Sequence, residues 1–207
     1  DPVSHAIDAV RTELHAYACA EQARALQRYF QTSPGGYGEG DRFIGVRVPV
    51  LRTLAAKFRS LPLPALRELL RSPVHEERSL ALLIMVRRAA RADADALEPI
   101  YRLYIEELDH VNNWDLVDTS AGPILGAWLW SRPRGELYRL AGAASLWHRR
   151  IAIMATSRFI RLGDFDDTLR LAERLLDDRE DLIHKAVGWM LREVGKRDRR
   201  LEEAFLQ

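Results

Sequence analysis

A repeat with a period of about 36 residues constrains the fold of this chain more than any other feature of its sequence. Four corresponding positions follow one another at steps of 36, 36 and 35 residues, and they are Arg78, Trp114, Arg150 and Lys185. The three basic residues each stand at the start of a run of aliphatic and small residues, which is typical of a helix face that packs against another helix. A single unit of this length has too small a core to be stable alone, so we expect neighbouring units to stack.

Apolar residues recur at a spacing of about 3.6 residues along almost the whole chain, which predicts helices. The predicted helices lie at 3–17, 20–32, 48–60, 63–72, 75–91, 94–110, 113–130, 133–143, 146–162, 165–177, 180–196 and 198–206. The connections between them are short, and helices joined in this way lie antiparallel to their neighbours. The fold class that we expect is therefore all-α, an α-solenoid or superhelix of HEAT-like antiparallel helix pairs.

We expect the chain to form a single HEAT-like repeat domain over residues 1–207. Its expected parts are N-terminal helices at 1–33, a Gly-rich loop at 34–41 and stacked helix pairs at 48–207. The loop lacks the GxGxxG spacing of phosphate-binding loops and no strand precedes it, so a flexible connector is the favoured interpretation. Residues 43–48 alternate weakly between apolar and polar, but Pro49 follows at once, which favours an extended approach to a helix over a strand.

The composition is that of a globular protein with no strong charge signal. The chain has 207 residues, of which 47% are hydrophobic, and this is enough to bury a sizeable core. Its net charge of +1 does not indicate a nucleic-acid partner, although a balanced total can hide a local basic surface. Arginine accounts for 28 of the 31 basic residues. Arginine suits phosphate, but a bias in genome composition is the simpler explanation.

The sequence shows no motif for metal, acyl-transfer or nucleotide chemistry. Its six histidines are scattered without a pair at metal-ligand spacing, and it has neither a GxSxG elbow nor a GK[ST] loop. We therefore expect no metal and no cofactor. Cys19 is the only cysteine, which fits a reducing compartment, and no apolar run of about 18 residues and no signal peptide is present. We expect a cytoplasmic protein with no membrane partner.

Trp114 and Asp118 are the strongest candidates for a functional site. They stand four residues apart, so both project from one face of a predicted helix. Trp189 occupies the repeat position that corresponds to Asp118, while Arg150 and Lys185 correspond to Trp114. Aromatic faces beside a carboxylate suit a flat cationic ligand, and arginines suit phosphates. The alternative is structural, because a tryptophan on a helix is most often core and an aspartate one turn away often pairs with an arginine.

At these residues the chain resembles the AlkD family of bacterial DNA alkylation repair glycosylases, which are built from HEAT-like repeats. The matching segments are FIGVRVPVLRTLA (43–55), NNWDLVD (112–118), LWHRRIAI (146–153) and IHKAVGWMLRE (183–193). The resemblance implies a DNA glycosylase that excises positively charged alkylated purines, such as 3-methyladenine and 7-methylguanine, from duplex DNA in base excision repair. The Gly-rich insertion at 34–41 departs from the better-known members of that family.

The resemblance also implies roles for single residues. Asp118 is similar in position to the family's catalytic aspartate. Trp114 and Trp189 correspond to the tryptophans beside the sugar of the lesion, and Arg150 corresponds to an arginine at the neighbouring backbone. Tyr29 corresponds to an aromatic residue near the site and is a candidate for DNA binding. The further candidates for contacts with the DNA backbone are Lys185, Arg192 and Arg149.

The implied chemistry needs few groups. A base that is methylated on a ring nitrogen already carries a positive charge and leaves without protonation, so no general acid is required. The carboxylate of Asp118 then stabilises an oxocarbenium-like sugar and positions a water molecule. The resemblance implies that the base need not be flipped into a deep pocket, so contacts with the DNA backbone provide most of the affinity.

Two other functions stay open at this point. The first is a non-catalytic HEAT-repeat paralogue that binds DNA structures, which predicts salt-sensitive DNA binding without base release. The second is a protein-interaction scaffold, which predicts no affinity for DNA. The partner that we expect is double-stranded DNA with alkylated bases, bound by a monomer in the bacterial cytoplasm in association with the nucleoid.

Overall fold

Every regular element of the protein is a helix. The structure is a computed structural model that describes residues 1–207. The only β feature is an isolated bridge between Arg42 and Val74. Two compact units divide the chain: unit 1 covers Asp1–Leu116 and unit 2 covers Val117–Gln207. The predicted all-α class is confirmed, whereas the prediction of a single domain stays a prediction, because a compact unit is not by itself an independent domain.

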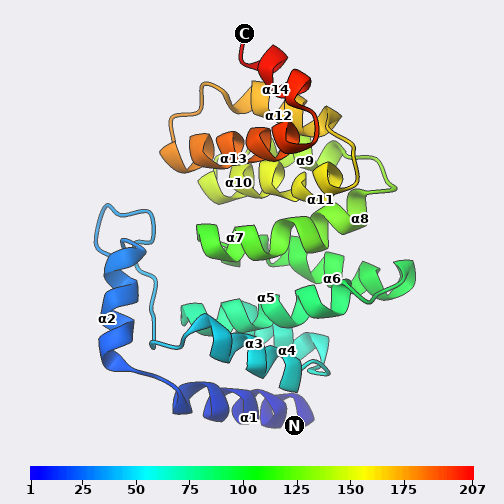
Figure 1. Ribbon diagram of the computed structural model, residues 1–207. Helices are drawn as coiled ribbons and strands as arrows, with labels where there is room; N and C mark the ends of the chain where they lie inside the picture. The colour runs from blue at the N-terminus through cyan, green and yellow to red at the C-terminus, as the bar shows by residue number, and fades with distance from the viewer. The chain divides into compact units, whose positions relative to one another are not determined.

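Unit 1 is built around a central helix. Its elements are α1 (Pro2–Ala16), α2 (Ala20–Tyr29), α3 (Val48–Lys57), α4 (Leu63–Leu70), α5 (His75–Ala89), α6 (Ala94–Glu106), the 3-10 helix η1 (Leu108–His110) and the first residues of α7 (Trp114–Ser120). Helix α5 lies against α3, α4 and α6, and α4 also lies against α1 (Figure 1). Figure 1 shows α2 standing at the side of this group, followed by the Gly-rich loop.

Unit 2 is also built around a central helix. After the last residues of α7, its elements are the π-helical turn η2 (Ala121–Gly126), α8 (Ala127–Leu129), α9 (Gly135–Ala141), α10 (Leu146–Ala155), α11 (Ser157–Arg161), α12 (Asp166–Leu175), α13 (Asp181–Arg197) and α14 (Arg199–Phe205). Helix α10 lies against η2, α9 and α13 (Figure 1). Helix α13 lies in turn against α12 and α14.

Local sequence explains where several helices begin. Proline occupies the first turn of α1, α3 and α4, where its missing N–H removes no helical hydrogen bond. Asp1 and Asp93 cap α1 and α6 with their side chains. The side chain of Asn113 accepts a hydrogen bond from the backbone N–H of Trp114, at 2.8 Å, directly before α7.

The segment before α3 is extended, as the sequence predicts, and a buried carboxylate holds it in place. Glu76 accepts hydrogen bonds from the backbone N–H groups of Ile44, Gly45 and Val46, at 2.7 to 3.2 Å. Gly45 has φ of 84°, and a Cβ at this position would collide with the backbone carbonyl of Cys19. Only glycine therefore combines a positive φ with room for the carbonyl of Cys19 at this position.

Two long helices predicted from the sequence are interrupted in the structure. The helix predicted at 113–130 passes through the π-helical turn η2, which contains Pro123. Proline has no N–H to donate, and its ring excludes the regular hydrogen-bonding pattern. The helix predicted at 146–162 is divided at Thr156, whose hydroxyl donates to the carbonyl of Ile153 at 2.6 Å. A hydroxyl bonded back to its own helix in this way favours a bend.

Glycines explain two further features of unit 2. Side chains at Gly122 and Gly126 would collide with Ser157 and with the carbonyl of Ala155, so the helical segment that follows Asp118 approaches α10 and α11 closely. Gly195 lies inside α13, which continues to Arg197, close to the predicted end at residue 196. A Cβ at Gly195 would collide with the carboxylate of Glu202, so its small size accommodates α14 rather than ending α13.

None of the helices combines the length and apolar composition needed to span a bilayer.

Candidate functional site

Asp118 and Trp189 line the same cavity in unit 2. The cavity has a volume of about 350 Å³ and opens between η2, α10, α11 and α13. Its other lining residues are Pro123, Met154, Ser157, Ile160, Arg161, Met190, Glu193 and Arg197. The side chain of Asp118 is 14% exposed and Trp189 is 39% exposed, so a carboxylate and an indole both reach this space. The structure therefore brings together two of the residues that the sequence singles out.

Arg150 holds the carboxylate of Asp118 through a two-point contact. Its Nε lies 3.0 Å from Asp118 Oδ1 and its Nη2 lies 2.9 Å from Oδ2. Its Nη1 donates to the backbone carbonyl of Leu182 at 2.5 Å, and the Arg150 side chain is only 6% exposed. The paired form of Asp118, which the sequence leaves open as its structural alternative, is thus present on the wall of the cavity. The contact fixes the orientation of the carboxylate.

A second carboxylate, Glu193, lines the cavity from α13. It forms ion pairs with Lys196 and Arg197 at 2.7 and 3.4 Å. Hydrogen bonds from Lys196 lower the pKa of Glu193 below its usual range, so this group is negatively charged at neutral pH. The cavity therefore combines two carboxylates and two arginines, Arg161 and Arg197, with one aromatic face. Such a lining can contact both a flat cationic base and a phosphate.

Arg149 has a different environment from its neighbour Arg150. It forms a two-point contact with Asp178 at 2.7 and 3.2 Å and donates to the carbonyls of Ala143 and Ala144. Burial raises the pKa of Asp178, but hydrogen bonds from Arg149 outweigh this effect and lower it. Arg149 is only 8% exposed, so a DNA contact by this residue requires the pair to open, and that role stays a prediction.

Two predicted DNA-binding residues share the face of α13 that carries Trp189. Lys185 precedes Trp189 by four residues and Arg192 follows it by three, a spacing that places all three on one side of a helix. Lys185 forms an exposed ion pair with Asp181 at 3.2 Å. Arg192 is exposed and extends over Gly188, which has no side chain to obstruct it. Both cations are accessible to a ligand from solvent.

In unit 1, Trp114 belongs to an aromatic cluster. Its ring stacks on Phe30 with centroids 5.3 Å apart and meets the edge of Tyr29 at 6.2 Å. Tyr29 is 64% exposed, so the structure places the predicted aromatic pair, Tyr29 and Trp114, together at a surface. The indole N–H of Trp114 donates to the hydroxyl of Tyr37 at 3.3 Å, and that hydroxyl donates to the carbonyl of Tyr29 at 3.2 Å.

The Gly-rich loop that contains Tyr37 is folded back on the end of α2. The N–H groups of Gly38 and Gly40 donate to the carbonyls of Gln31 and Thr32. A side chain at Gly38 would collide with the carbonyl of Phe30, so the glycine permits this close approach. Sequence reasoning treated this loop as a connector and missed Tyr37. The signal that was present is an aromatic residue inside a Gly-rich run.

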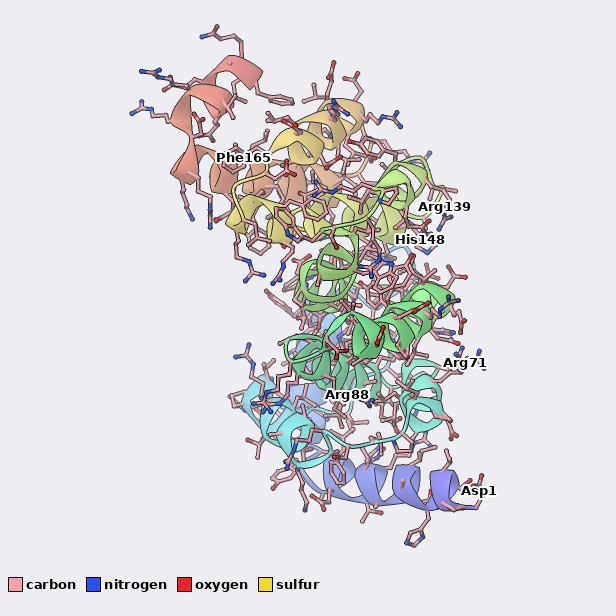
Figure 2. All side chains as sticks on the ribbon, turned by 90° about the vertical axis from the view of Figure 1, so that its right-hand side faces the viewer. Asp1, Arg71, Arg88, Arg139, His148 and Phe165 are labelled. Atoms are coloured by element: carbon pink, nitrogen blue, oxygen red, sulfur yellow. The ribbon has the colours of Figure 1, made fainter.

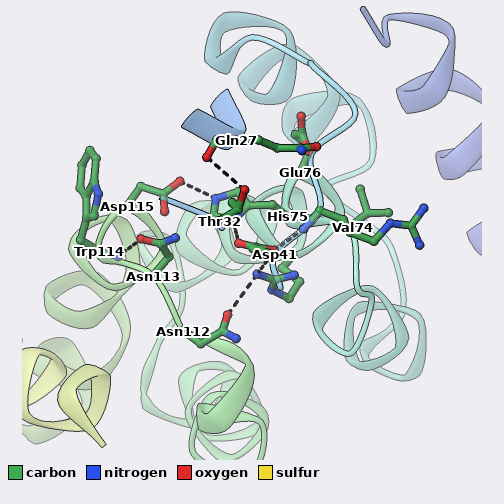
Figure 3. Close-up of polar contacts among 12 residues, drawn as sticks. Gln27, Thr32, Asp41, Val74, His75, Glu76, Asn112, Asn113, Trp114 and Asp115 are labelled. Carbon is green, nitrogen blue, oxygen red and sulfur yellow. Dashed lines mark hydrogen bonds and ion pairs between the residues drawn. The ribbon is translucent and has the colours of Figure 1, made fainter. Parts of the chain in front are cut away.

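A buried ionic network ties the end of this loop to the start of α7. His75 lies between two carboxylates, 2.6 Å from Asp41 Oδ2 and 2.7 Å from Asp115 Oδ2 (Figure 3). Arg78 contacts both Asp41 and Asn112, at 3.0 and 3.1 Å. Burial lowers the pKa of His75, but the two carboxylates outweigh this effect and raise it to about 9. His75 is therefore a buried cation at neutral pH, and it holds the residue that follows Trp114.

No group of three or more His, Cys, Asp or Glu residues is arranged to hold a metal ion. The chemistry that the geometry allows is electrostatic, with oriented carboxylates and aromatic faces acting on a cationic ligand.

Comparison with known proteins shows what the chain is similar to. Residues 10–207 match the family described as "DNA alkylation repair enzyme". A solved structure described as a predicted DNA alkylation repair enzyme from Enterococcus faecalis superposes on the chain with a TM-score of 0.66 and 18% sequence identity. The match covers 91% of this chain and 88% of that one, and at this identity it shows the same all-α helical repeat fold. No curated protein sequence matches the chain.

Proposed function

The chain belongs to the DNA alkylation repair enzyme family, and from this premise we propose that it is a DNA glycosylase that excises positively charged alkylated purines from duplex DNA. The expected substrates are 3-methyladenine and 7-methylguanine. The observation that carries the proposal is the cavity of unit 2, where the oriented carboxylate of Asp118 and the exposed indole of Trp189 face the same space. A cationic base and an oxocarbenium-like sugar are the species that such a space stabilises.

The carboxylate of Asp118 supplies the electrostatic part of the reaction. A unit charge about 4 Å from a carboxylate gains ~4 kcal/mol at an effective dielectric of about 20, against ~1 kcal/mol in water. The difference of about 3 kcal/mol corresponds to roughly two orders of magnitude in rate. The alkylated base is already a cation and leaves as a neutral base with the electrons of the glycosidic bond. A water molecule beside Asp118 then adds to the sugar and releases a proton to solvent.

Arg150 has two successive roles in this proposal. In the absence of DNA it orients Asp118, and its charge offsets part of the field of the carboxylate. When DNA binds, this buried pair opens and the guanidinium turns to a backbone phosphate, which restores the field of Asp118 at the sugar. Phosphate binding and activation of the carboxylate are therefore coupled through one side chain.

The remaining candidates divide by their environment. Trp114 and Tyr29 form an aromatic cluster in unit 1, and we propose that these two residues contact the DNA. Lys185 and Arg192 are exposed on α13 and contact the DNA backbone. Arg149 is assigned no DNA contact in this proposal, since Asp178 and two carbonyls engage it. The proposed partner is alkylated double-stranded DNA, bound by a monomer.

A second function is supported by the same ion pair. Because Arg150 engages both oxygens of Asp118, a chain in which this contact never opens binds DNA without catalysis. This is the non-catalytic DNA-binding paralogue.

Release of 3-methyladenine and 7-methylguanine from methylated duplex DNA tests the proposal. The protein is used at a concentration at which binding of the same duplex is demonstrated by fluorescence anisotropy. Time-dependent release of both bases supports the glycosylase. Binding without release supports the paralogue, and absence of binding at physiological salt contradicts both and favours a scaffold.

A further inference from the structure

A second cavity lies in unit 1, at the far end of α5 from the His75 network. It has a volume of about 330 Å³. Its polar lining residues are Arg59, Ser60, Arg87, Arg88 and Arg91, and its apolar wall includes Ile100. Arg88, near the end of α5, is labelled in Figure 2. The arginines come from the connection after α3 and from the end of α5 and the connection that follows it. We call this group the arginine pocket.

The four arginines of this pocket form no ion pair with any carboxylate. Other arginines of unit 1 do, since Arg67 and Arg71 contact Glu107 and Arg102 contacts Glu98. The pocket is therefore a place where four arginines without a carboxylate partner are gathered.

Two of the four guanidinium groups are held in place by the backbone. Arg59 donates to the carbonyl of Ala56 at 3.1 Å, and Arg88 donates to the carbonyl of Leu61 at 2.8 Å. Each guanidinium carries five N–H donors, so these contacts leave most of the donors for a ligand. Pre-orientation of this kind reduces the entropy that binding would otherwise lose.

The ordinary explanation for arginines at helix ends does not account for the whole cluster. Cations near a helix C-terminus offset about half a negative charge per helix, so the ends of α3 and α5 together balance about one of the four positive charges. The nearest acidic residues in the sequence are Asp93 and Asp95 of α6, and Asp93 already caps that helix. Even with both acids counted, and half a positive charge for the start of α6, a surplus of about +1.5 remains.

We propose that the arginine pocket binds phosphates of a DNA backbone, at a place on unit 1 separate from the aromatic cluster of Trp114. The planar guanidinium fork matches two phosphate oxygens, and arginine is the side chain best suited to this contact. Arg59, Arg87 and Arg91 are exposed. They come from the connection after α3, the end of α5 and the connection that follows it, which suits an extended polyanion better than an enclosed small ligand.

The separation follows from helix geometry. Arg88 follows His75 by thirteen residues along α5, and at 1.5 Å per residue this corresponds to about 20 Å. The phosphates that contact the arginine pocket are therefore different from those that lie beside Trp114. The inference goes beyond base excision, because it requires DNA binding alone and holds whether or not the chain is a glycosylase.

The salt dependence of binding to an undamaged duplex tests this inference. The test variant is Arg87→Ala/Arg91→Ala. The control is Arg67→Ala/Arg71→Ala, which removes the same formal charge from arginines that already have Glu107 as a partner. Affinities are measured by fluorescence anisotropy between about 50 and 200 mM salt, where each phosphate contact contributes about 0.9 to the slope of log K against log salt.

The expected result is a slope that is smaller by about 1 to 2 in the test variant, with weaker binding at low salt and an unchanged slope in the control. Arg87→Lys/Arg91→Lys should recover most of the slope, because it keeps the charge. A wild-type slope in Arg87→Ala/Arg91→Ala would overturn the proposal. Because the duplex carries no lesion, failure here is distinct from failure of the glycosylase reaction.

Discussion

At the scale of single residues, two neighbouring arginines of α10 form pairs of the same kind with different surroundings. Arg149 holds Asp178 and two backbone carbonyls, away from the lining of the cavity of unit 2. Arg150 holds Asp118 on the wall of that cavity. The chemistry of the two pairs is nearly identical, so a difference between their variants reports on the cavity and not on the loss of a buried ion pair in general.

The buried His75 makes the stability of the protein depend on pH. The folded protein raises the pKa of His75 from 6.5 to about 9, against the effect of burial, because Asp41 and Asp115 both contact it and Arg78 is the only nearby cation in the network. Protonated His75 therefore stabilises the fold fully below about pH 6.5, and this contribution is lost as the pH rises through about 9. The loss is on the order of 2–3 kcal/mol.

Urea unfolding of the wild type at intervals from pH 6 to pH 9.5 measures this loss. His75→Gln should be less stable at pH 6 and should show a flatter profile over the same range. A wild-type free energy of unfolding that stays constant or increases between pH 6.5 and 9 would exclude the assigned role of His75.

At the scale of elements, the Gly-rich loop is a support for Trp114. Its residue Tyr37 accepts from the indole N–H of Trp114 and donates to the carbonyl of Tyr29. Its last residue, Asp41, reaches α7 through His75. We therefore interpret the insertion as part of the aromatic cluster. Tyr37 contacts Trp114 directly, and Asp41 is linked through His75 to Asp115, the residue after Trp114.

Tyr37→Phe removes both hydrogen bonds and keeps the ring. We expect the free energy of unfolding to fall by about 0.5–1.5 kcal/mol. If Trp114 acts at the lesion, the single-turnover rate of base release should also fall several-fold while affinity for undamaged DNA stays the same. The control is Tyr17→Phe, at an exposed tyrosine that makes no side-chain hydrogen bond, and it should match the wild type in both measurements. If the two variants have the same stability and the same rate of base release, the loop does not support Trp114.

Gly45 tests the extended segment that precedes α3. Gly45→Ala places a Cβ against the carbonyl of Cys19 at a φ of 84°, and we expect a loss of more than about 2 kcal/mol in urea unfolding. The matched control is Gly135→Ala at the first residue of α9, where no atom lies near the added Cβ. That variant should be neutral or slightly more stable. A Gly45→Ala protein as stable as the wild type would show that the segment adapts.

Helix positions were largely predictable, because apolar periodicity and proline at first turns are local signals. The predicted helix at 75–91 and the observed α5 (His75–Ala89) differ only at the end. The π-helical turn around Pro123 and the break at Thr156 were not predicted, since both depend on how a single residue alters a helix that its neighbours support. The helix predicted at 180–196 agrees closely with α13, but the reason for a glycine at position 195 is a tertiary contact with Glu202 that the sequence does not show.

Site residues were predictable only in part, for the same reason. The repeat period placed Trp189 at the position that corresponds to Asp118, and the structure puts both on one cavity. The partners that orient the site come from other helices. Neither the contact of Arg150 with Leu182 nor the contact of Tyr37 with Trp114 leaves a trace in local sequence spacing.

At the scale of the whole molecule, a net charge of +1 conceals an uneven distribution. Many surface arginines are paired with carboxylates, whereas those of the arginine pocket are not. DNA affinity in this account comes from a few uncompensated positions and not from the total charge. The proposed base release requires in addition that Asp118 acts on the sugar of the lesion.

The most direct test of that claim compares Asp118→Asn with Asp178→Asn in single-turnover base release from methylated duplex DNA. Both variants are assayed at a temperature at which circular dichroism shows them folded. We predict that Asp118→Asn slows release by about 100-fold or more, with DNA affinity unchanged or slightly higher because a negative charge near phosphates is lost. Asp178→Asn should release bases within about threefold of the wild-type rate, although it is less stable. Wild-type release by Asp118→Asn, or equal losses in the two variants, would contradict the account.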